Sequence, residues 1–211
     1  MAEGEPRLPS VLNIALTGNA AAGKSTVARW FKEWGATLID ADDLVREAER
    51  PGSPTLAEIA RRFGHRVLLP DGSLDRPRLR RIVLDDEAQR EALNAIVHPT
   101  VQARRGELVR EARDRGDAIV VNDIPLLFEV LDPGAFDLVV LVDAPEAVRR
   151  MRLQERGLDA GEIDRLLAAQ LPADVKRGRS HIVLDNAGTL EQLRHAAWDA
   201  WQTIEKRSEG A

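Results

Sequence analysis

The feature that most constrains the fold is a loop of small residues between an apolar run and a helix-like segment. The loop matches the spacing G-x-x-x-x-G-K-[ST] and reads Gly18-Asn19-Ala20-Ala21-Ala22-Gly23-Lys24-Ser25. Residues 11–17 before it form a short apolar run, typical of a buried strand. Residues 24–34 after it read as a helix that ends at Gly35. The sequence therefore predicts a strand, a tight loop and a helix in direct succession.

This succession predicts a phosphate-binding loop. Backbone N–H groups of such a loop surround phosphate groups, and the N-terminus of the following helix adds a positive field. Lys24 would reach the β- and γ-phosphates, and the Ser25 hydroxyl would ligate Mg²⁺. The alternative is a tight strand–helix connection with a surface lysine, which the surrounding strand and helix disfavour. The residues expected to bind ATP are Gly18, Asn19, Ala20, Ala21, Ala22, Gly23, Lys24, Ser25 and Thr26.

Four more apolar runs predict the rest of a sheet. They are residues 37–40, 118–123, 138–143 and 182–185, and helical segments separate them. Short buried strands that alternate with helices are typical of a parallel sheet covered on both faces. We therefore expect an α/β fold of the P-loop NTPase type, with a five-stranded, mostly parallel sheet flanked by helices.

The segment from residue 51 to residue 116 is helical and charged and interrupts this alternation. We expect it to form a helical substrate subdomain, with Ser53 capping its first helix and separate helices over 87–97 and from Pro99 onward. The core would then comprise residues 11–50 and 117–208, and residues 1–10 would be a disordered tail.

Composition excludes several classes of function. The chain has 211 residues and a net charge of −5, whereas a general nucleic-acid binder needs a basic surface. No apolar run approaches the roughly 18 residues that a membrane-spanning helix needs. The N-terminus lacks the apolar segment of a signal peptide, and the chain has no cysteine. We therefore expect a cytoplasmic protein with no nucleic-acid or membrane partner. The oligomeric state stays open at this point, because the predicted exposed helices allow a monomer or a weak homotrimer.

Nucleotide binding by itself does not define the reaction. A GTPase switch needs a D-x-x-G segment after an early strand, but here the only one, residues 185–188, follows the last strand. The base-reading motif N-K-x-D is also absent, because none of Lys32, Lys176 and Lys206 follows an asparagine. A small-molecule kinase fits best, and a non-catalytic nucleotide-binding module is the alternative.

A kinase of this kind needs a carboxylate near the accepting hydroxyl. The acids at the carboxyl ends of the predicted strands are Asp40, Asp42, Asp123 and Asp143. Position alone favours helix capping for Asp42 and Asp143, since aspartate is a preferred N-cap. Asp123 could hold Mg²⁺ through water, and whether Asp123 or Asp143 contacts the metal stays open at this point.

Two basic clusters allow two interpretations. They consist of Arg149, Arg150, Arg152 and Arg156, and of Lys176, Arg177 and Arg179. Arginine-rich stretches usually form solvated helix faces. The functional interpretation is a lid over residues 150–180 that closes on the triphosphate and excludes water.

From residue 12 to residue 188 the chain resembles the dephospho-CoA kinase family. The resemblance rests on the order and spacing of the phosphate loop with six further motifs, namely Ile39-Asp40-Ala41-Asp42, Leu93-Asn94-Ala95-Ile96-Val97-His98-Pro99, Asp123-Ile124-Pro125-Leu126-Leu127-Phe128-Glu129, Gln154-Glu155-Arg156, Ala168-Ala169-Gln170 and Asp185-Asn186-Ala187-Gly188. It implies ATP-dependent phosphorylation of the ribose 3′-hydroxyl of dephospho-CoA, the last step of coenzyme A synthesis.

The same resemblance implies roles for individual residues. Asp42 would be the general base, in place of the cap that position alone favours, and Arg156 a lid residue that pairs with phosphates. Acceptor-binding positions would be His98, Pro125, Leu126 and Leu127. The chain departs from the family pattern in the loop, where Asn19 and Ala21 replace glycines, and we expect Ala21 to avoid a positive φ. A different metabolite kinase on the same fold is the nearest alternative enzyme.

Overall fold

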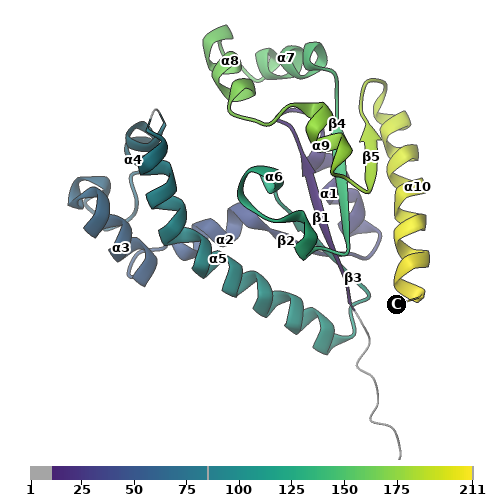
Figure 1. Cartoon of the computed structure of the whole chain (residues 1–211), viewed down its shortest axis with the longest axis horizontal. Coiled ribbons are helices and arrows are strands. Elements are labelled where there is room, and N and C mark those ends of the chain that lie inside the picture. The colour runs from purple at the N-terminus through teal and green to yellow at the C-terminus, as the bar shows by residue number, and fades with distance from the viewer. Residues whose placement is uncertain (1–10, 85, 211) are drawn as a thin grey trace, which may run out of the picture. The chain divides into compact units, whose positions relative to one another are not determined.

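The computed structural model describes residues 11–84 and 86–210 (Figure 1). The predicted disordered tail at residues 1–10 lies outside the described residues. Packing divides the chain into two units, which we name the sheet unit (residues 1–39 and 109–211) and the helical unit (residues 40–108).

Five strands form one sheet in the order β2-β3-β1-β4-β5. The pairs β1–β3, β1–β4 and β4–β5 are parallel. This arrangement confirms the predicted five-stranded α/β fold. The strands are β1 (Leu12–Gly18), β2 (Thr37–Asp40), β3 (Ile119–Asp123), β4 (Leu138–Asp143) and β5 (Ile182–Asp185).

Helices connect these strands within the sheet unit (Figure 1). Two of them, at residues 127–130 and 173–178, were not predicted. For the second, residues 161–171 were expected to form a single helix and no helix was expected after Pro172. The structure instead places a second short helix there, which begins directly after Pro172. The helices are α1 (Lys24–Glu33), α6 (Leu127–Val130), α7 (Glu146–Glu155), α8 (Ala160–Ala168), α9 (Ala173–Gly178) and α10 (Leu190–Glu209), with a 3₁₀ turn, η2 (Pro133–Ala135).

The hydrophobic core of the sheet unit lies between one face of the sheet and helices α1 and α10. Phe31 of α1 and Trp201 of α10 pack with their ring centroids 5.5 Å apart. Strand side chains alternate between the two faces, so Ile14 points into this core while its neighbour Ala15 faces the opposite way. Ala15 is also fully buried. The sheet is therefore covered on both faces, as its continuous apolar strands predict.

The helical unit has a hydrophobic core of its own. Ile59 and Phe63 of α3 pack there with Val67, Leu79 and Val97. The Ser53 hydroxyl accepts a 3.0 Å hydrogen bond from the backbone N–H of Leu56, which confirms the predicted cap. The elements are α2 (Ala41–Ala48), α3 (Pro54–Phe63), η1 (His65–Val67), α4 (Arg76–Val83) and α5 (Glu87–Arg115), and α5 continues past residue 108.

One helix boundary in this unit was predicted wrongly. Separate helices were expected over 87–97 and from Pro99, but α5 runs without interruption through Pro99. Proline removes one backbone hydrogen bond and usually bends or ends a helix. Here Val97 and Val101 both pack against the core of the helical unit. These tertiary contacts stabilise the helix on each side of the missing hydrogen bond.

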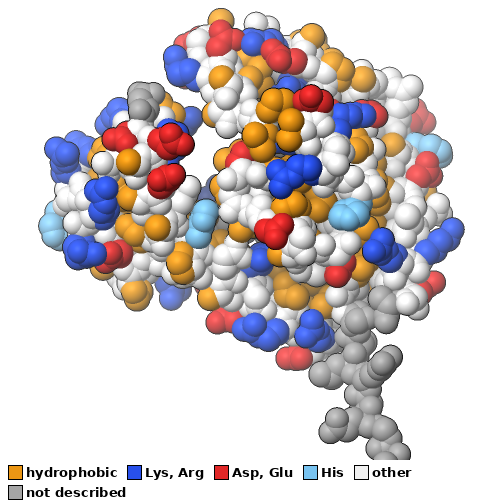
Figure 2. Space-filling model, in the orientation of Figure 1, with side chains coloured by type: hydrophobic (Ala, Val, Ile, Leu, Met, Phe, Trp, Pro, Cys, Tyr) orange, Lys and Arg blue, Asp and Glu red, His pale blue; other side chains and the backbone are white. Residues whose placement is uncertain are grey.

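Acidic and basic side chains are interspersed over the face shown in Figure 2. This mixture agrees with a chain in which 30 basic and 35 acidic residues nearly balance. Within the described parts of the chain, no helix combines the length and the apolar character needed to cross a bilayer.

Candidate functional site

The phosphate loop lies where the sequence predicts it. β1 ends at Gly18, and α1 begins at Lys24 directly after Gly23. Gly23 adopts a φ of 105°, which a residue with a side chain rarely adopts. A Cβ atom there would also collide with the side-chain amide of Asn186. The second glycine of the motif is therefore required by both its backbone conformation and its packing.

Ala21 in this loop contradicts the sequence-based expectation. It was expected to avoid a positive φ, but its φ is 59°. The left-handed conformation costs a non-glycine residue about 1–2 kcal/mol. The carbonyl of Ala21 accepts a 3.2 Å hydrogen bond from Arg152 of α7, and the carbonyl of Ala22 accepts one of 2.8 Å from Asn186. These two contacts hold the loop in its strained conformation.

Lys24 forms an ion pair with Asp123. The two residues come together because β1 and β3 are adjacent, with Leu16 of β1 in register with Asp123 at the end of β3. The side chains of Lys24 and Asp123 are only 14% and 8% exposed. A carboxylate therefore lies at the phosphate loop, next to the lysine of the motif.

The donors at this position fit Mg²⁺. Ser25 in the first turn of α1 offers a hydroxyl, and Asp123 offers a carboxylate. Mg²⁺ prefers such oxygen ligands and usually takes the remaining ones from water and substrate phosphates. Elsewhere among the described residues, no group of three or more histidine or acidic side chains gathers in a way that could hold a metal.

Asp143 is not the helix cap that its position suggested. The residue before α7 is Pro145, whose apolar side chain cannot accept a capping hydrogen bond. The carboxylate of Asp143 instead accepts hydrogen bonds of 2.9 Å from the backbone N–H of Ala144 and from Arg177. Arg177 also binds Asp185 at 2.6 Å. Its hydrogen bond lowers the pKa of Asp185 below the usual 3.8 and raises that of Arg177 itself.

The second basic cluster is therefore engaged with the protein. Lys176 is fully buried and forms a 2.7 Å ion pair with Glu129 of α6. Arg177 lies between Asp143 and Asp185. The interpretation of this cluster as a solvated helix face is wrong for Lys176. Lys176 thus attaches α9 to α6, and Arg177 attaches α9 to the ends of β4 and β5.

The first basic cluster contains the residues that sequence reasoning missed. Arg149 is buried and donates to the carbonyl of Ala144, whereas Arg152 donates both to Ala21 and to Asn186. Arg156 was the arginine singled out, and it lies exposed at the end of α7. In the sequence, Arg152 is one of several arginines in this cluster, and no sequence signal indicates that it contacts the phosphate loop.

The segment after β3 also reaches the phosphate-loop end of β1. The hydroxyl of Thr17 donates a 3.3 Å hydrogen bond to the carbonyl of Pro125. Leu126 is 39% exposed, whereas Leu127 begins α6 and is fully buried. Of the three residues expected to bind the acceptor here, Leu126 has the most accessible side chain.

Two predicted site residues belong to the helical unit. Asp42 is exposed in the first turn of α2, and it does not cap that helix. The cap is Asp40, whose carboxylate accepts from the backbone N–H groups of Asp42 at 2.8 Å and Asp43 at 3.3 Å. The capping interpretation of Asp42 is therefore wrong. His98 is half-buried inside α5, and not beside a helix start as expected.

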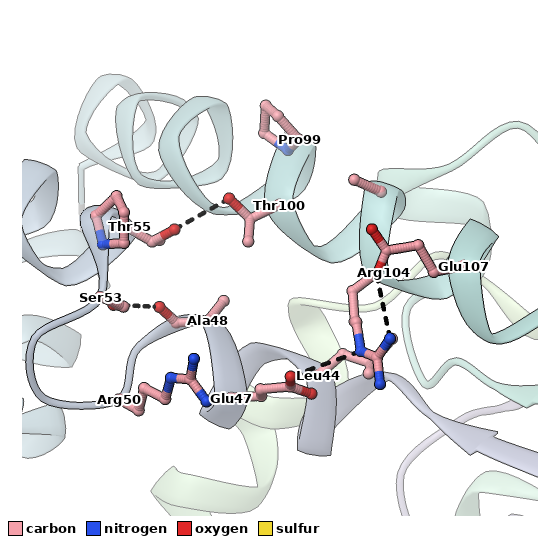
Figure 3. Close-up of a pocket in the computed structure, with 12 residues that line it drawn as sticks. Leu44, Glu47, Ala48, Arg50, Ser53, Thr55, Pro99, Thr100, Arg104 and Glu107 are labelled. Carbon is pink, nitrogen blue, oxygen red and sulfur yellow. Dashed lines mark hydrogen bonds and ion pairs between the residues drawn. The ribbon is translucent and has the colours of Figure 1, made fainter.

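The helical unit also contains a pocket of about 500 Å³ (Figure 3). This volume lies within the range of small-molecule sites, about 300–1,000 Å³. Arg104 points along one wall and contacts Glu47 at 3.5 Å and Glu107 at 3.1 Å. The lining residues are Leu44, Glu47, Ala48, Arg50, Ser53, Pro54, Thr55, Pro99, Thr100, Ala103, Arg104 and Glu107.

Comparisons with known proteins agree on one family. A family model described as dephospho-CoA kinase matches residues 12–192. Among curated relatives, the dephospho-CoA kinase of Thermobifida fusca is 40% identical over 93% of this chain and 98% of its own. That of Anaeromyxobacter dehalogenans is 47% identical over 85% and 86%. A protein of known crystal structure from Thermus thermophilus superposes with a TM-score of 0.76 and 35% identity, covering 92% of this chain and 97% of that one.

Proposed function

The chain belongs to the dephospho-CoA kinase family, and from this we infer that it catalyses the last step of coenzyme A biosynthesis. It is an ATP-dependent transferase that phosphorylates dephospho-CoA. The observation that carries this function is the phosphate loop, with Lys24 paired to the carboxylate that ends β3.

We propose that residues 18–26 hold the triphosphate of ATP. The backbone N–H groups of the loop and the N-terminus of α1 would donate to its oxygens. Lys24 would move from Asp123 toward the β- and γ-phosphates, where it would offset negative charge that develops during transfer. Ser25 and Asp123 would hold Mg²⁺, which supplies further charge neutralisation when it is bound.

Asp42 is the proposed general base. Its carboxylate would accept the proton of the ribose 3′-hydroxyl while that oxygen attacks the γ-phosphorus of ATP. The bond from the γ-phosphorus to the β–γ bridging oxygen breaks, and ADP leaves with the bridging oxygen. The exposed position of Asp42 supports this role, because its carboxylate is not used for capping α2.

We propose that the acceptor is bound by His98 and by residues 125–127. The pocket of the helical unit would hold a further part of dephospho-CoA, and its lining, which combines apolar side chains with Arg50, Thr55 and Arg104, supports this assignment. Arg156 would pair with phosphates as part of a lid over residues 150–180. The helical unit would thus serve the acceptor, and the sheet unit would serve the nucleotide.

The test is an ADP-release assay with the purified protein, ATP and Mg²⁺ over a short panel of acceptors. Dephospho-CoA should give one ADP and one coenzyme A per turnover, and the 3′-deoxy analogue of dephospho-CoA should give none. Shikimate and a nucleoside monophosphate are the controls for other small-molecule kinases. Turnover with either of these, and none with dephospho-CoA, would redirect the assignment to a different metabolite kinase. ATP binding without transfer to any acceptor would favour a non-catalytic module.

We also propose that the protein works in the cytoplasm as a monomer or weak homotrimer, without nucleic-acid or membrane partners. Sedimentation velocity over a range of protein concentrations tests the oligomeric state. A stable dimer at all concentrations would contradict it.

A further inference from the structure

One N–H group of the phosphate loop already has a partner. The backbone N–H of Ala20 donates a 3.0 Å hydrogen bond to the side-chain carbonyl of Gln170. Gln170 lies between α8 and α9, 150 residues further along the chain. Gln170 belongs to the motif Ala168-Ala169-Gln170, but the function proposed above gives its side chain no role.

The position of Gln170 is fixed by its neighbours. The next residue, Leu171, donates its backbone N–H to the carboxylate of Glu129 at 3.0 Å. The same carboxylate oxygen pairs with the buried Lys176 at 2.7 Å. Two contacts on one carboxylate therefore hold the chain on the C-terminal side of Gln170. The hydrogen bond to Ala20 is made from an anchored backbone, and the side chain of Gln170 is half-buried.

Gln170 offers the loop the kind of atom that a phosphate offers. A side-chain carbonyl oxygen accepts from a backbone N–H, as a phosphate oxygen does, but it carries no charge. Hydrogen bonds to a charged acceptor are roughly twice as strong as those to a neutral one. A neutral acceptor therefore satisfies the Ala20 N–H, which is costly to leave unpaired in a partly buried loop, and yields to a phosphate.

We propose that Gln170 is a placeholder for phosphate in the nucleotide-free protein. Its side-chain oxygen occupies the hydrogen-bonding position at Ala20 that an oxygen of ATP takes on binding. Binding of the triphosphate then breaks the contact between the loop and the segment that joins α8 to α9. This inference rests on the proposed binding of ATP by residues 18–26.

The test compares wild-type protein with Gln170→Met, which keeps the length of the side chain and removes its acceptor. The amide signals of the ¹⁵N-labelled proteins are recorded with and without saturating ATP and Mg²⁺. Without nucleotide, the Ala20 signal should differ between the two proteins, because only the wild type has the Gln170 partner. With ATP, the Ala20 signals should coincide, because phosphate is then the partner in both. The control is Gln202→Met on α10, whose side chain is exposed, and it should leave Ala20 unchanged throughout.

Binding constants for ATP provide a second measurement. Gln170→Met should bind ATP as tightly as the wild type or up to about threefold more tightly, because a competitor is removed. Gln170→Glu places a charged acceptor at the same N–H and should raise the Kd about tenfold, whereas Gln202→Glu should not change it.

Two results would overturn the inference. One is an Ala20 difference that persists under saturating ATP, because Gln170 would then remain at the loop. The other is a Kd that rises fivefold or more in Gln170→Met, because the side chain would then support the bound nucleotide. A wild-type protein in which no loop signal responds to ATP would instead contradict the proposed function.

Discussion

The ammonium group of Lys24 and the carboxylate of Asp123 are paired across 99 residues of sequence at the ends of two adjacent strands. Both side chains are largely buried. A buried charge without a partner is costly, so each group stabilises the other in the absence of nucleotide. The lysine that would bind phosphate is thus held close to the loop before ATP arrives.

Replacing Lys24 by alanine should lower kcat/KM for ATP by about 10²–10³, the usual cost of removing one transition-state donor. Lys24 is the cation that the phosphate-loop motif itself brings to the β- and γ-phosphates. Lys32→Ala, on the exposed face of the same helix, should keep full activity. The measurement is steady-state ADP release, with circular dichroism to confirm the fold. An unchanged rate in Lys24→Ala would remove Lys24 from the site.

Asp42→Asn should lower kcat by about 10²–10⁴, the contribution of a positioned general base. The matched control is Asp43→Asn, since both acids lie in the first turn of α2 and neither caps it. The control should remain within about twofold of the wild type. If Asp42→Asn lowers kcat less than threefold, Asp42 makes no contact specific to the transition state.

Arg152→Met should weaken ATP binding about tenfold, the effect of losing one or two charged hydrogen bonds. The hydrogen bond from Arg152 to the carbonyl of Ala21 stabilises the left-handed backbone of Ala21. Without this contact the loop should relax. Arg150→Met is the control, because that arginine pairs only with Glu146 and Asp164 on the exposed side of α7 in the contacts described. Isothermal titration with ATP measures the change. Equal affinities in the two variants would show that Arg152 does not shape the loop.

Lys176→Met should destabilise the protein by about 3–5 kcal/mol, the cost of leaving one partner of a buried ion pair uncompensated. Lys176 is fully buried against Glu129. Adding Glu129→Gln to this variant removes the unpaired charge and should recover part of the loss. Urea unfolding of the single and double variants gives both free energies. A double variant less stable than Lys176→Met would contradict the pairing.

Glu49 should make stability depend on pH. Burial raises the pKa of Glu49 above its usual 4.5 and outweighs the attraction of Arg76, which pairs with it. The folded state therefore binds the proton more tightly than the unfolded state. The stability gained from this proton is fully present below pH 4.5 and is lost as the pH rises through the raised pKa. Urea unfolding between pH 4.5 and 8 should show this slope in the wild type and a smaller one in Glu49→Gln.

Much of the sheet unit could be predicted from local sequence. All five strands and the start of α1 fall within one residue of their predicted bounds, because short apolar runs and the glycines of the loop act over neighbouring residues. The fold class and the family followed from the same local motifs and their order. Pro99 shows the limit of this reasoning, since local propensity predicts a break and packing on both sides of the proline overrides it.

The sequence by itself determined which segment forms the phosphate loop and which acids and bases accompany it. Tertiary structure alone decided which of them meet. Arg152, Asn186 and Gln170 reach the loop from positions more than 130 residues away, and Lys176 meets Glu129 rather than a solvated surface. The physical reason is that backbone preferences depend on nearby residues, whereas hydrogen bonds and ion pairs depend on strand order and helix packing.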